Sequence, residues 1–377
     1  MSVVVDNMWS HFINELPQHQ LPYSKKNWGN PNHSLCSYQG KLKPSIAYHL
    51  VNIFVSKDGQ VFDPFSGVGT IPFEAALNGR RAFGMDISPL AYYVSSAKLH
   101  RNDEDKCLNI ISKLNNFIEG SKLPRNYFAT NSKFGFNRTL AEYYNKNTFK
   151  EILKARLYFQ QNPPTSSEEM LVISSLLHIL HGNRPYALSR RSHPIVPYAP
   201  TGEYEYKNLI NKLTDKVIKS VRTEMPADFH EGTMFLQDST TVWPEEINDL
   251  DAIITSPPFF DSTRFYMANW IRLWFVGWNN DDFKEEPKKY IDEKQKEDFA
   301  IYDSIFEQGR ERLKDGGYFV MHLGKSKKCD MGEVLLHRYH GLFRNAHLYI
   351  ENVENCAKFG IKDLGTVTDH EYLVLEK

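Results

Sequence analysis

The feature that most constrains this chain is a series of short apolar runs, most of which end in turn-forming residues. Five of these runs cover residues 59–67, 80–88, 232–239, 250–258 and 316–324. Buried parallel strands have this appearance, because both of their faces are covered and their carboxyl ends meet along one edge of a sheet. We therefore predict parallel strands whose turn-forming ends make up a ligand-binding edge.

Helix-like segments, such as residues 69–79 and 299–317, lie between these runs. Strands that alternate with helices predict βαβ units, so we expect an α/β fold with a doubly wound, mostly parallel sheet. Two late runs, at residues 347–353 and 371–377, are separated by a polar loop and are expected to add an antiparallel edge.

The alternation stops once, from about residue 105 to residue 231, where apolar residues recur at helical spacing. This stretch is far longer than the ~2–6 residues of an ordinary α/β connection, which predicts an inserted helical region. We thus expect an α/β domain made of residues 1–104 and 232–377, interrupted by a helical insertion of residues 105–231.

The charges of the chain are nearly balanced, with 45 Lys and Arg residues against 46 Asp and Glu residues. This balance excludes a uniformly polycationic nucleic-acid coat, but it allows a basic patch on one face. Residues 121–160 contain eight basic and two acidic residues, which indicates either such a patch or an ordinary solvated helix face. A second basic segment, residues 181–198, carries Arg184, Arg190, Arg191 and His193 among aromatic residues and prolines.

The four cysteines stand far apart and form no CxxC pair, so we expect free thiols rather than a disulfide framework or a metal site. The N-terminal apolar run lacks the basic region of a signal peptide, and no apolar stretch approaches the ~20 residues of a membrane span. These features predict a soluble, cytoplasmic protein without membrane contact.

Residues 63–70, DPFSGVGT, leave an apolar run and open a helix-like segment. Gly67 and Gly69 allow a tight turn that a ligand can approach closely, and the start of a helix favours an anionic group. Asp86 follows Gly69 by 17 residues, at the end of the next predicted strand, where it is placed to bind ribose hydroxyls. Asp238 ends the third predicted strand and could accept a hydrogen bond from an adenine amino group; either acid could instead cap a helix.

Residues 255–260, TSPPFF, directly follow another apolar run. Two prolines fix φ and remove two N–H donors, which leaves carbonyl groups pointing out of the turn. The Ser256 hydroxyl and the Pro257 carbonyl could accept both protons of an exocyclic amino group, while Phe259 stacks on its flat heterocycle. The alternative is a rigid proline turn with core aromatics.

Taken together, the segments DPFSGVGT, GMDIS (residues 84–88), FLQDS (residues 235–239) and TSPPFF resemble the class I S-adenosylmethionine-dependent amino-methyltransferases of DNA. That family carries an FxGxG cofactor loop and a (Ser/Asn/Asp)-Pro-Pro-(Tyr/Phe) catalytic motif. Residues 33–51 are similar to the segment that precedes the loop in the family. The resemblance covers residues 1–104 and 232–377, leaves the insertion unaligned, and implies a Rossmann-like class I methyltransferase fold.

The resemblance also implies roles for individual residues, without a metal. The target base would be held by Ser256, Pro257, Pro258 and Phe259. S-adenosylmethionine would be bound by Tyr38, Lys41, Asp63, Phe65, Ser66, Gly67, Gly69, Thr70, Asp86, Ile87 and Asp238.

Serine at the first catalytic position is most typical of cytosine-N4 enzymes in that family. The resemblance therefore implies site-specific methyl transfer to N4 of a flipped cytosine in duplex DNA, with adenine-N6 methylation as the alternative. An RNA base amino-methyltransferase and a catalytically silent DNA-binding protein are further alternatives. Duplex DNA would be gripped through Arg184, Arg190, Arg191 and His193, and a cognate restriction endonuclease acting on the same site is expected in a prokaryotic cytoplasm.

Overall fold

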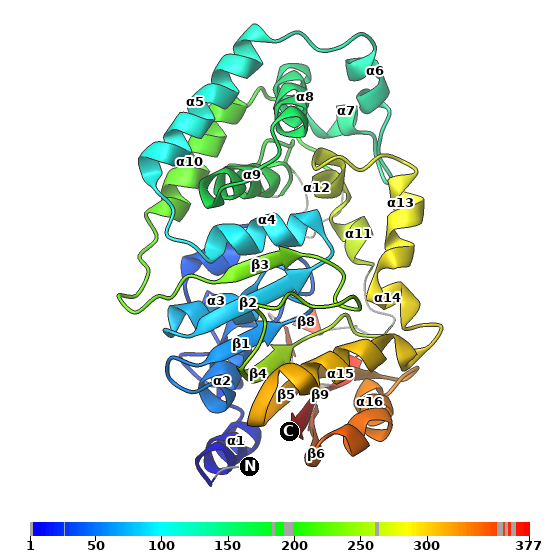
Figure 1. Cartoon of the computed structure of the whole chain (residues 1–377). Coiled ribbons are helices and arrows are strands. Elements are labelled where there is room, and N and C mark those ends of the chain that lie inside the picture. Colours follow the sequence, from blue (N-terminus) through cyan, green and yellow to red (C-terminus); the bar gives the residue numbers. More distant parts are fainter. Residues whose placement is uncertain are drawn as a thin grey trace.

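A seven-stranded sheet runs through the molecule in the order β3-β2-β1-β4-β5-β9-β6 (Figure 1). The computed structural model describes residues 3–25, 27–182, 185–191, 199–260, 264–352, 357–358, 361–362 and 367–377. The strands are β1 (Gln60–Asp63), β2 (Arg81–Asp86), β3 (Thr233–Leu236), β4 (Leu250–Thr255), β5 (Leu313–Ser326), β6 (Asn345–Asn352) and β9 (Val367–Glu376). A separate two-stranded sheet pairs β7 (Ala357–Lys358) with β8 (Ile361–Lys362).

The first five strands pair in parallel, whereas β9 pairs antiparallel with both β5 and β6. The two late apolar runs therefore form the predicted antiparallel part of the sheet, and β6 is its edge strand. The predicted fold class, a doubly wound and mostly parallel sheet of the Rossmann-like class I methyltransferase type, is confirmed.

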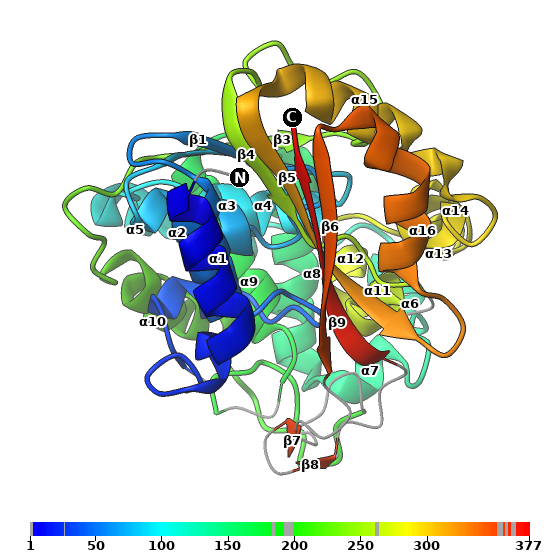
Figure 2. The same ribbon diagram turned by 90° about the horizontal axis from the view of Figure 1, so that it is seen from below.

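Helices cover both faces of the sheet (Figure 2). One face shares an apolar core with helices from the first part of the chain, and the opposite face shares a second core with two late helices. The helices on the first face are α1 (Val3–Glu15), α2 (Pro44–Phe54) and α3 (Thr70–Leu77), and those on the second are α15 (Asp303–Arg312) and α16 (Met331–Tyr339). On the second face Gly309 allows close packing, because a Cβ there would lie 2.5 Å from Phe319.

A third core joins α4 (Pro89–Lys98) to helices that lie outside the sheet layers (Figure 1). The described parts of residues 105–231 form helices and connecting loops, and strand β3 begins only at Thr233. The division into two domains stays a prediction, because these helices share their core with α4 and α12 (Trp270–Phe275). The helices of the stretch 105–231 are α5 (Glu104–Gly120), α6 (Tyr127–Ser132), α7 (Leu140–Tyr143), α8 (Lys146–Gln161), α9 (Ser167–Ile179) and α10 (Leu209–Val221).

One residue of the basic stretch 121–160 lies inside this helical core. The Arg156 guanidinium donates from Nε to the Trp274 carbonyl (2.8 Å) and from Nη1 to the Tyr127 hydroxyl (2.8 Å). It also lies 4.9 Å from the centre of the Trp274 ring. Arg156 therefore connects α8 to α12, and it does not belong to a basic surface.

The segment after the catalytic motif adds short helices: α11 (Phe265–Ala268), α13 (Asp282–Glu285) and α14 (Ile291–Lys294). Trp270 and Trp274 of α12 and Trp278, which follows the helix, are all buried. In the part of the chain that the structure describes, no helix has the length and apolar character needed to cross a membrane. The described cysteines Cys36, Cys107 and Cys329 are free thiols.

Candidate active site

The predicted cofactor loop and the catalytic motif meet at the carboxyl edge of the sheet. Strand β1 ends at Asp63 between β2, which ends at Asp86, and β4, which ends at Thr255. The same edge continues into β5, which pairs in parallel with β4. Parallel strands thus bring together side chains that lie almost 200 residues apart in sequence.

The glycine-rich loop has the backbone conformation that its sequence predicts. Gly67 and Gly69 have φ angles of +51° and +69°, in the left-handed region that favours glycine. At Gly69 there is also no room for a side chain, because a Cβ would lie 2.9 Å from Ser95 Oγ. The Ser95 hydroxyl donates to the Gly67 carbonyl (2.8 Å), so the loop is held against α4 before α3 begins at Thr70.

Asp86 holds the loop from the neighbouring strand. One carboxylate oxygen accepts a hydrogen bond from the Gly67 N–H (2.8 Å) and the other accepts from the Ser88 N–H (2.8 Å). Burial raises the pKa of Asp86 to about 6, although both hydrogen bonds favour the ionised form. A carboxylate oxygen keeps further lone pairs, so Asp86 can still accept hydrogen bonds from ribose hydroxyls.

Asp63 connects the loop to the catalytic strand. Its Oδ1 accepts hydrogen bonds from the Thr255 hydroxyl (2.6 Å) and from the Phe65 N–H (3.1 Å). Asp63 is 2% exposed, and burial raises its pKa to about 7. This residue therefore acts inside the loop and has little surface to offer a ligand.

Aromatic rings line the space in front of the loop. The Tyr38 ring lies 3.8 Å from the position of a Cβ at Gly67, and its centre lies 4.8 Å from the ring of Phe265. Burial and the nearby charge of Asp86 raise the pKa of Tyr38 well above its ordinary value, so its ring is neutral. The site thus combines a glycine backbone that a ligand can approach, the rings of Tyr38 and Phe265, and the carboxylate of Asp86. These features fit the adenosine part of S-adenosylmethionine.

The other predicted cofactor residues differ in their surroundings. Asp238 accepts from the N–H (2.9 Å) and hydroxyl (2.8 Å) of Thr240 and pairs with Lys294 (3.3 Å), so it stabilises its own turn. Lys41 donates to the His33 carbonyl (2.6 Å). Ser66 is buried against Met234 (3.7 Å). At the loop edge, Thr70 is buried, and the partly exposed residues are Phe65 and Ile87.

In the catalytic motif, two groups are fixed by partners from later in the chain. The Ser256 hydroxyl lies 3.1 Å from Nδ1 of His322 on β5. The Pro258 carbonyl accepts a hydrogen bond from Gln295 Nε2 (3.1 Å), and Gln295 is 1% exposed. The Pro257 carbonyl therefore remains the candidate for the second acceptor of an amino group.

The ring of Phe259 lies directly against a glycine of β5. A Cβ at Gly324 would lie 2.4 Å from the Phe259 ring, a distance that real side chains do not reach. Two histidine rings are close to the same phenylalanine, with centroid distances of 5.6 Å to His322 and 6.2 Å to His370. The missing side chain at Gly324 thus decides where the stacking ring lies.

Sequence reasoning missed the residues that support the motif. His322 and Gly324 lie two positions apart in the apolar run 316–324, which places both on one face of a strand. A histidine inside an otherwise apolar strand was the available signal. Gln295 and His370 lie in segments without a comparable pattern.

The predicted DNA-binding residues are only partly described. Arg184 and His193 lie outside the described residues. The Arg190 guanidinium donates to the carbonyls of Gly202 and Glu142 (2.9 Å for the latter) and lies 3.9 Å from the centre of the Tyr204 ring. Arg191 is exposed. Arg190 therefore stabilises the local fold, whereas the exposed Arg191 side chain is the one of the two that could contact DNA.

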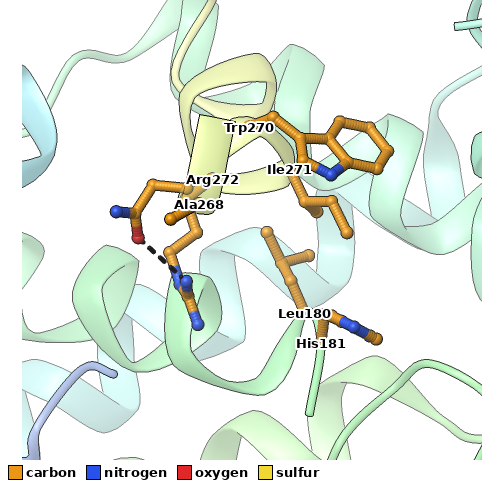
Figure 3. Close-up of a pocket in the computed structure, with 7 residues that line it drawn as sticks. Leu180, His181, Ala268, Trp270, Ile271 and Arg272 are labelled. Atoms are coloured by element: carbon orange, nitrogen blue, oxygen red, sulfur yellow. Dashed lines mark hydrogen bonds between the residues drawn. The ribbon is translucent and has the colours of Figure 1, made fainter. Parts of the chain in front are cut away.

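A cavity near α12 is too small for a cofactor or a base. Figure 3 shows Arg272 at its wall, with a hydrogen bond from Nη1 to Asn269 (3.0 Å). The cavity has a volume of about 10 Å³, which is room for about one water molecule. Arg272 also donates from Nε to the Leu177 carbonyl (3.1 Å) in the last turn of α9, which is a structural contact. The described residues contain no cluster of three or more side chains fit to hold a metal ion.

Part of the chain matches a known family model. Residues 31–122, which contain Tyr38, the glycine-rich loop and Asp86, match the model of the RMKL-like methyltransferase domain. No curated protein matches the chain. The matched segment is thus similar to part of a methyltransferase domain.

Solved structures with a related fold are distant. An rRNA methylase from Streptococcus thermophilus is 8% identical, with a TM-score of 0.35, over 89% of this chain and 97% of the other. TrmN from Thermus thermophilus is 12% identical, with a TM-score of 0.33, over 92% of this chain and 52% of the other. The rRNA methyltransferase aviRa from Streptomyces viridochromogenes is 9% identical, with a TM-score of 0.32, over 91% and 88%.

A substitution at Gly324 tests the position of the stacking ring. We expect Gly324→Ala to displace Phe259, because its Cβ would lie 2.4 Å from that ring. Methyl transfer should fall about tenfold or more, since displacements of ~1 Å can cost ~100-fold. Cofactor affinity, measured by calorimetry, should stay near the wild-type value. Gly341→Ala, where a Cβ meets no atom within 4 Å, is the control; equal activities of the two variants would contradict the assignment.

The raised pKa of Asp86 predicts that cofactor binding depends on pH. Because the pKa of Asp86 is raised to about 6, the group becomes protonated as the pH falls below that value and loses acceptor capacity. Cofactor affinity should then decrease by up to about tenfold per pH unit below 6 and change little with this group above it. Calorimetric titration of the Asp86→Asn variant should show weaker cofactor binding, and the decrease in affinity below pH 6 should be absent. Asp63→Asn is the control, because it should remove only a separate titration near pH 7.

Proposed function

We propose that the protein transfers the methyl group of S-adenosylmethionine to the exocyclic N4 of a cytosine flipped out of duplex DNA. The observation that carries this proposal is the Ser256–Phe259 motif directly after β4, where the Ser256 hydroxyl (3.1 Å) and the Phe259 ring (5.6 Å between ring centres) both lie against His322 of β5. This arrangement suits a flat base that bears an amino group. The cofactor loop lies one strand away and is joined to β4 by the hydrogen bond between Thr255 and Asp63 (2.6 Å).

In this reaction the protein must orient a poor nucleophile, the amino nitrogen of cytosine. The amino nitrogen of cytosine is weakly nucleophilic because its lone pair is delocalised into the ring. Hydrogen bonds from both amino protons, one to Ser256 Oγ and one to the Pro257 carbonyl, favour a more tetrahedral nitrogen with its lone pair directed at the methyl group. Such preorganised hydrogen bonds can lower a barrier by several kcal/mol in a dry site. The bound cofactor supplies a methyl carbon activated by its sulfonium.

Access to the base requires flipping. A cytosine inside a duplex cannot reach the edge of the sheet, and extruding it costs a few kcal/mol. Phe259 would replace part of the lost stacking. The helical stretch of residues 105–231 and its exposed cations are proposed to grip duplex DNA, and a restriction endonuclease that acts on the same site would be a partner.

Identification of the methylated nucleoside tests the proposed acceptor. Wild-type protein with labelled S-adenosylmethionine should label duplex DNA, and nucleoside analysis should give N4-methylcytosine. Ser256→Ala should reduce transfer by about 100-fold or more, because one of two preorganised acceptors is lost. Exposed Ser34→Ala is the matched control. N6-methyladenine as the only product would make the protein an adenine enzyme, and labelled RNA alone would overturn the DNA assignment.

A pair of neighbouring arginines tests the DNA-binding surface. Exposed Arg191→Ala should lower the slope of log affinity against log salt by about 1, as expected for one lost phosphate contact. Arg190→Ala should leave this slope unchanged and reduce the free energy of unfolding by about 1–3 kcal/mol, because it removes hydrogen bonds to the carbonyls of Gly202 and Glu142. Salt titrations and denaturant unfolding separate the two effects. A wild-type slope in Arg191→Ala would show that this side chain does not contact phosphate.

A further inference from the structure

A buried histidine lies directly behind the serine of the catalytic motif. Strand β5 pairs with β4 so that Met321 is beside Thr255, which places His322 beside Ser256. His322 is 4% exposed, and its Nδ1 lies 3.1 Å from Ser256 Oγ. Nothing in the glycine-rich loop or in the proline turn requires a histidine at this point of an apolar strand.

The surroundings fix the orientation of the imidazole ring. The ring of His370 lies 4.8 Å from that of His322 at an interplanar angle of 77°, and the ring of Tyr372 lies 5.2 Å away. On the ligand side the centre of the Phe259 ring lies 5.6 Å away. His322 thus stands between the stacking ring and the interior of the protein, with its Nδ1 toward the motif.

A negative charge lies behind these rings. The Tyr372 hydroxyl donates to Glu351 Oε2 (3.0 Å), which also accepts from Gln18 Nε2 (3.1 Å). His19 lies 2.5 Å from the other oxygen of Glu351. Burial of Glu351 acts against its charge, but the hydrogen bonds from His19 and Tyr372 hold its pKa below the ordinary value. The ionised Glu351 carboxylate favours an additional proton on the two histidines that interact with it, His19 and His370.

The proposed reaction creates a proton that must be removed. When the amino nitrogen takes the methyl group, it acquires a positive charge and loses one of its two protons. A serine hydroxyl is not a base at neutral pH, so it can take that proton only if it gives its own proton to another group. A histidine next to a serine is the usual acceptor of this kind.

We propose that His322 is a positioning residue that accepts the hydroxyl proton of Ser256 through Nδ1. This inference rests on the proposed function, and it adds a proton acceptor to that site. With its proton directed at His322, Ser256 Oγ presents lone pairs to the amino group of the base. Its oxygen is then oriented for the substrate before the reaction begins.

The transfer step balances in atoms and electrons. The bond between nitrogen and the methyl carbon forms with the nitrogen lone pair, and the electrons of the carbon–sulfur bond return to sulfur, which becomes a neutral thioether. The amino nitrogen then gives a proton to Ser256 Oγ, and the hydroxyl proton of Ser256 moves to His322 Nδ1. The imidazolium returns this proton to solvent when the product leaves.

The pH dependence of turnover tests the role of His322. At saturating cofactor and DNA, kcat of the wild type should fall as the pH decreases, because a protonated His322 ring cannot accept a proton. The titratable groups whose rings lie against this ring are His370 and Tyr372 on β9. Behind them, Glu351 on β6 interacts with Tyr372, His370 and His19, and Lys43 interacts with Glu351.

His322→Gln can keep a hydrogen bond to Ser256, but it cannot accept a proton. We expect this variant to lose about 100-fold or more in kcat with KM values within about threefold of wild type, and to lose the acidic limb of the pH profile. His370→Gln is the matched control, because it removes the neighbouring imidazole and should keep that limb. An acidic limb that survives in His322→Gln would overturn the proposal.

A second measurement does not depend on activity. In ¹⁵N nuclear magnetic resonance of histidine-labelled protein, His322 is assigned as the signal missing from His322→Gln. Its neutral form should carry the proton on Nε2, with a Nδ1 shift typical of a hydrogen-bond acceptor that changes in Ser256→Ala. A proton on Nδ1 would show that His322 donates to Ser256, which overturns the proposal whatever the methyl acceptor. If the wild type makes no N4-methylcytosine, the proposed function fails, while this spectrum still decides the role of His322.

Discussion

The hydrogen bond between the Thr255 hydroxyl and Asp63 Oδ1 (2.6 Å) joins the two halves of the site. Asp63 ends the strand that leads into the cofactor loop, and Thr255 ends the strand that leads into the catalytic motif. Both groups are buried, so water does not compete strongly for this contact. The distance between the glycine-rich loop and the Ser256–Phe259 motif therefore depends on adjacent strands of one sheet.

A similar connection exists between the catalytic segment and the helical stretch. Arg156 of α8 donates to the Trp274 carbonyl, and Arg272 of α12 donates to the Leu177 carbonyl of α9. These buried cations have backbone carbonyls as partners, and losing such partners inside a core is costly. The region that would contact nucleic acid is consequently fixed to the segment that follows the catalytic motif.

Much of the fold and half of the site could be predicted from local pattern. The strands, the glycine-rich loop and the proline turn are specified by residues close in sequence, so Asp86 and Ser256 were found at the ends of the expected strands. His322 and Gly324 act through strand pairing, and a single sequence does not show which strands pair. The partners of Arg190 were hidden for the same reason, because Gly202 and Glu142 approach it only in the folded chain.

Because β5 pairs with β4, two residues on one face of β5, His322 and Gly324, both contact the Ser256–Phe259 motif. Gly324 makes space for the stacking ring, and His322, two residues earlier, stands behind the serine. Side chains alternate between the faces of a strand, so a shift of β5 by one residue would turn both positions away and present Met321 and Leu323 instead. Insertions in surface loops are tolerable for such a protein, but a one-residue insertion or deletion in β5 before His322 would remove the proposed base stacking and the proposed proton acceptance in one event.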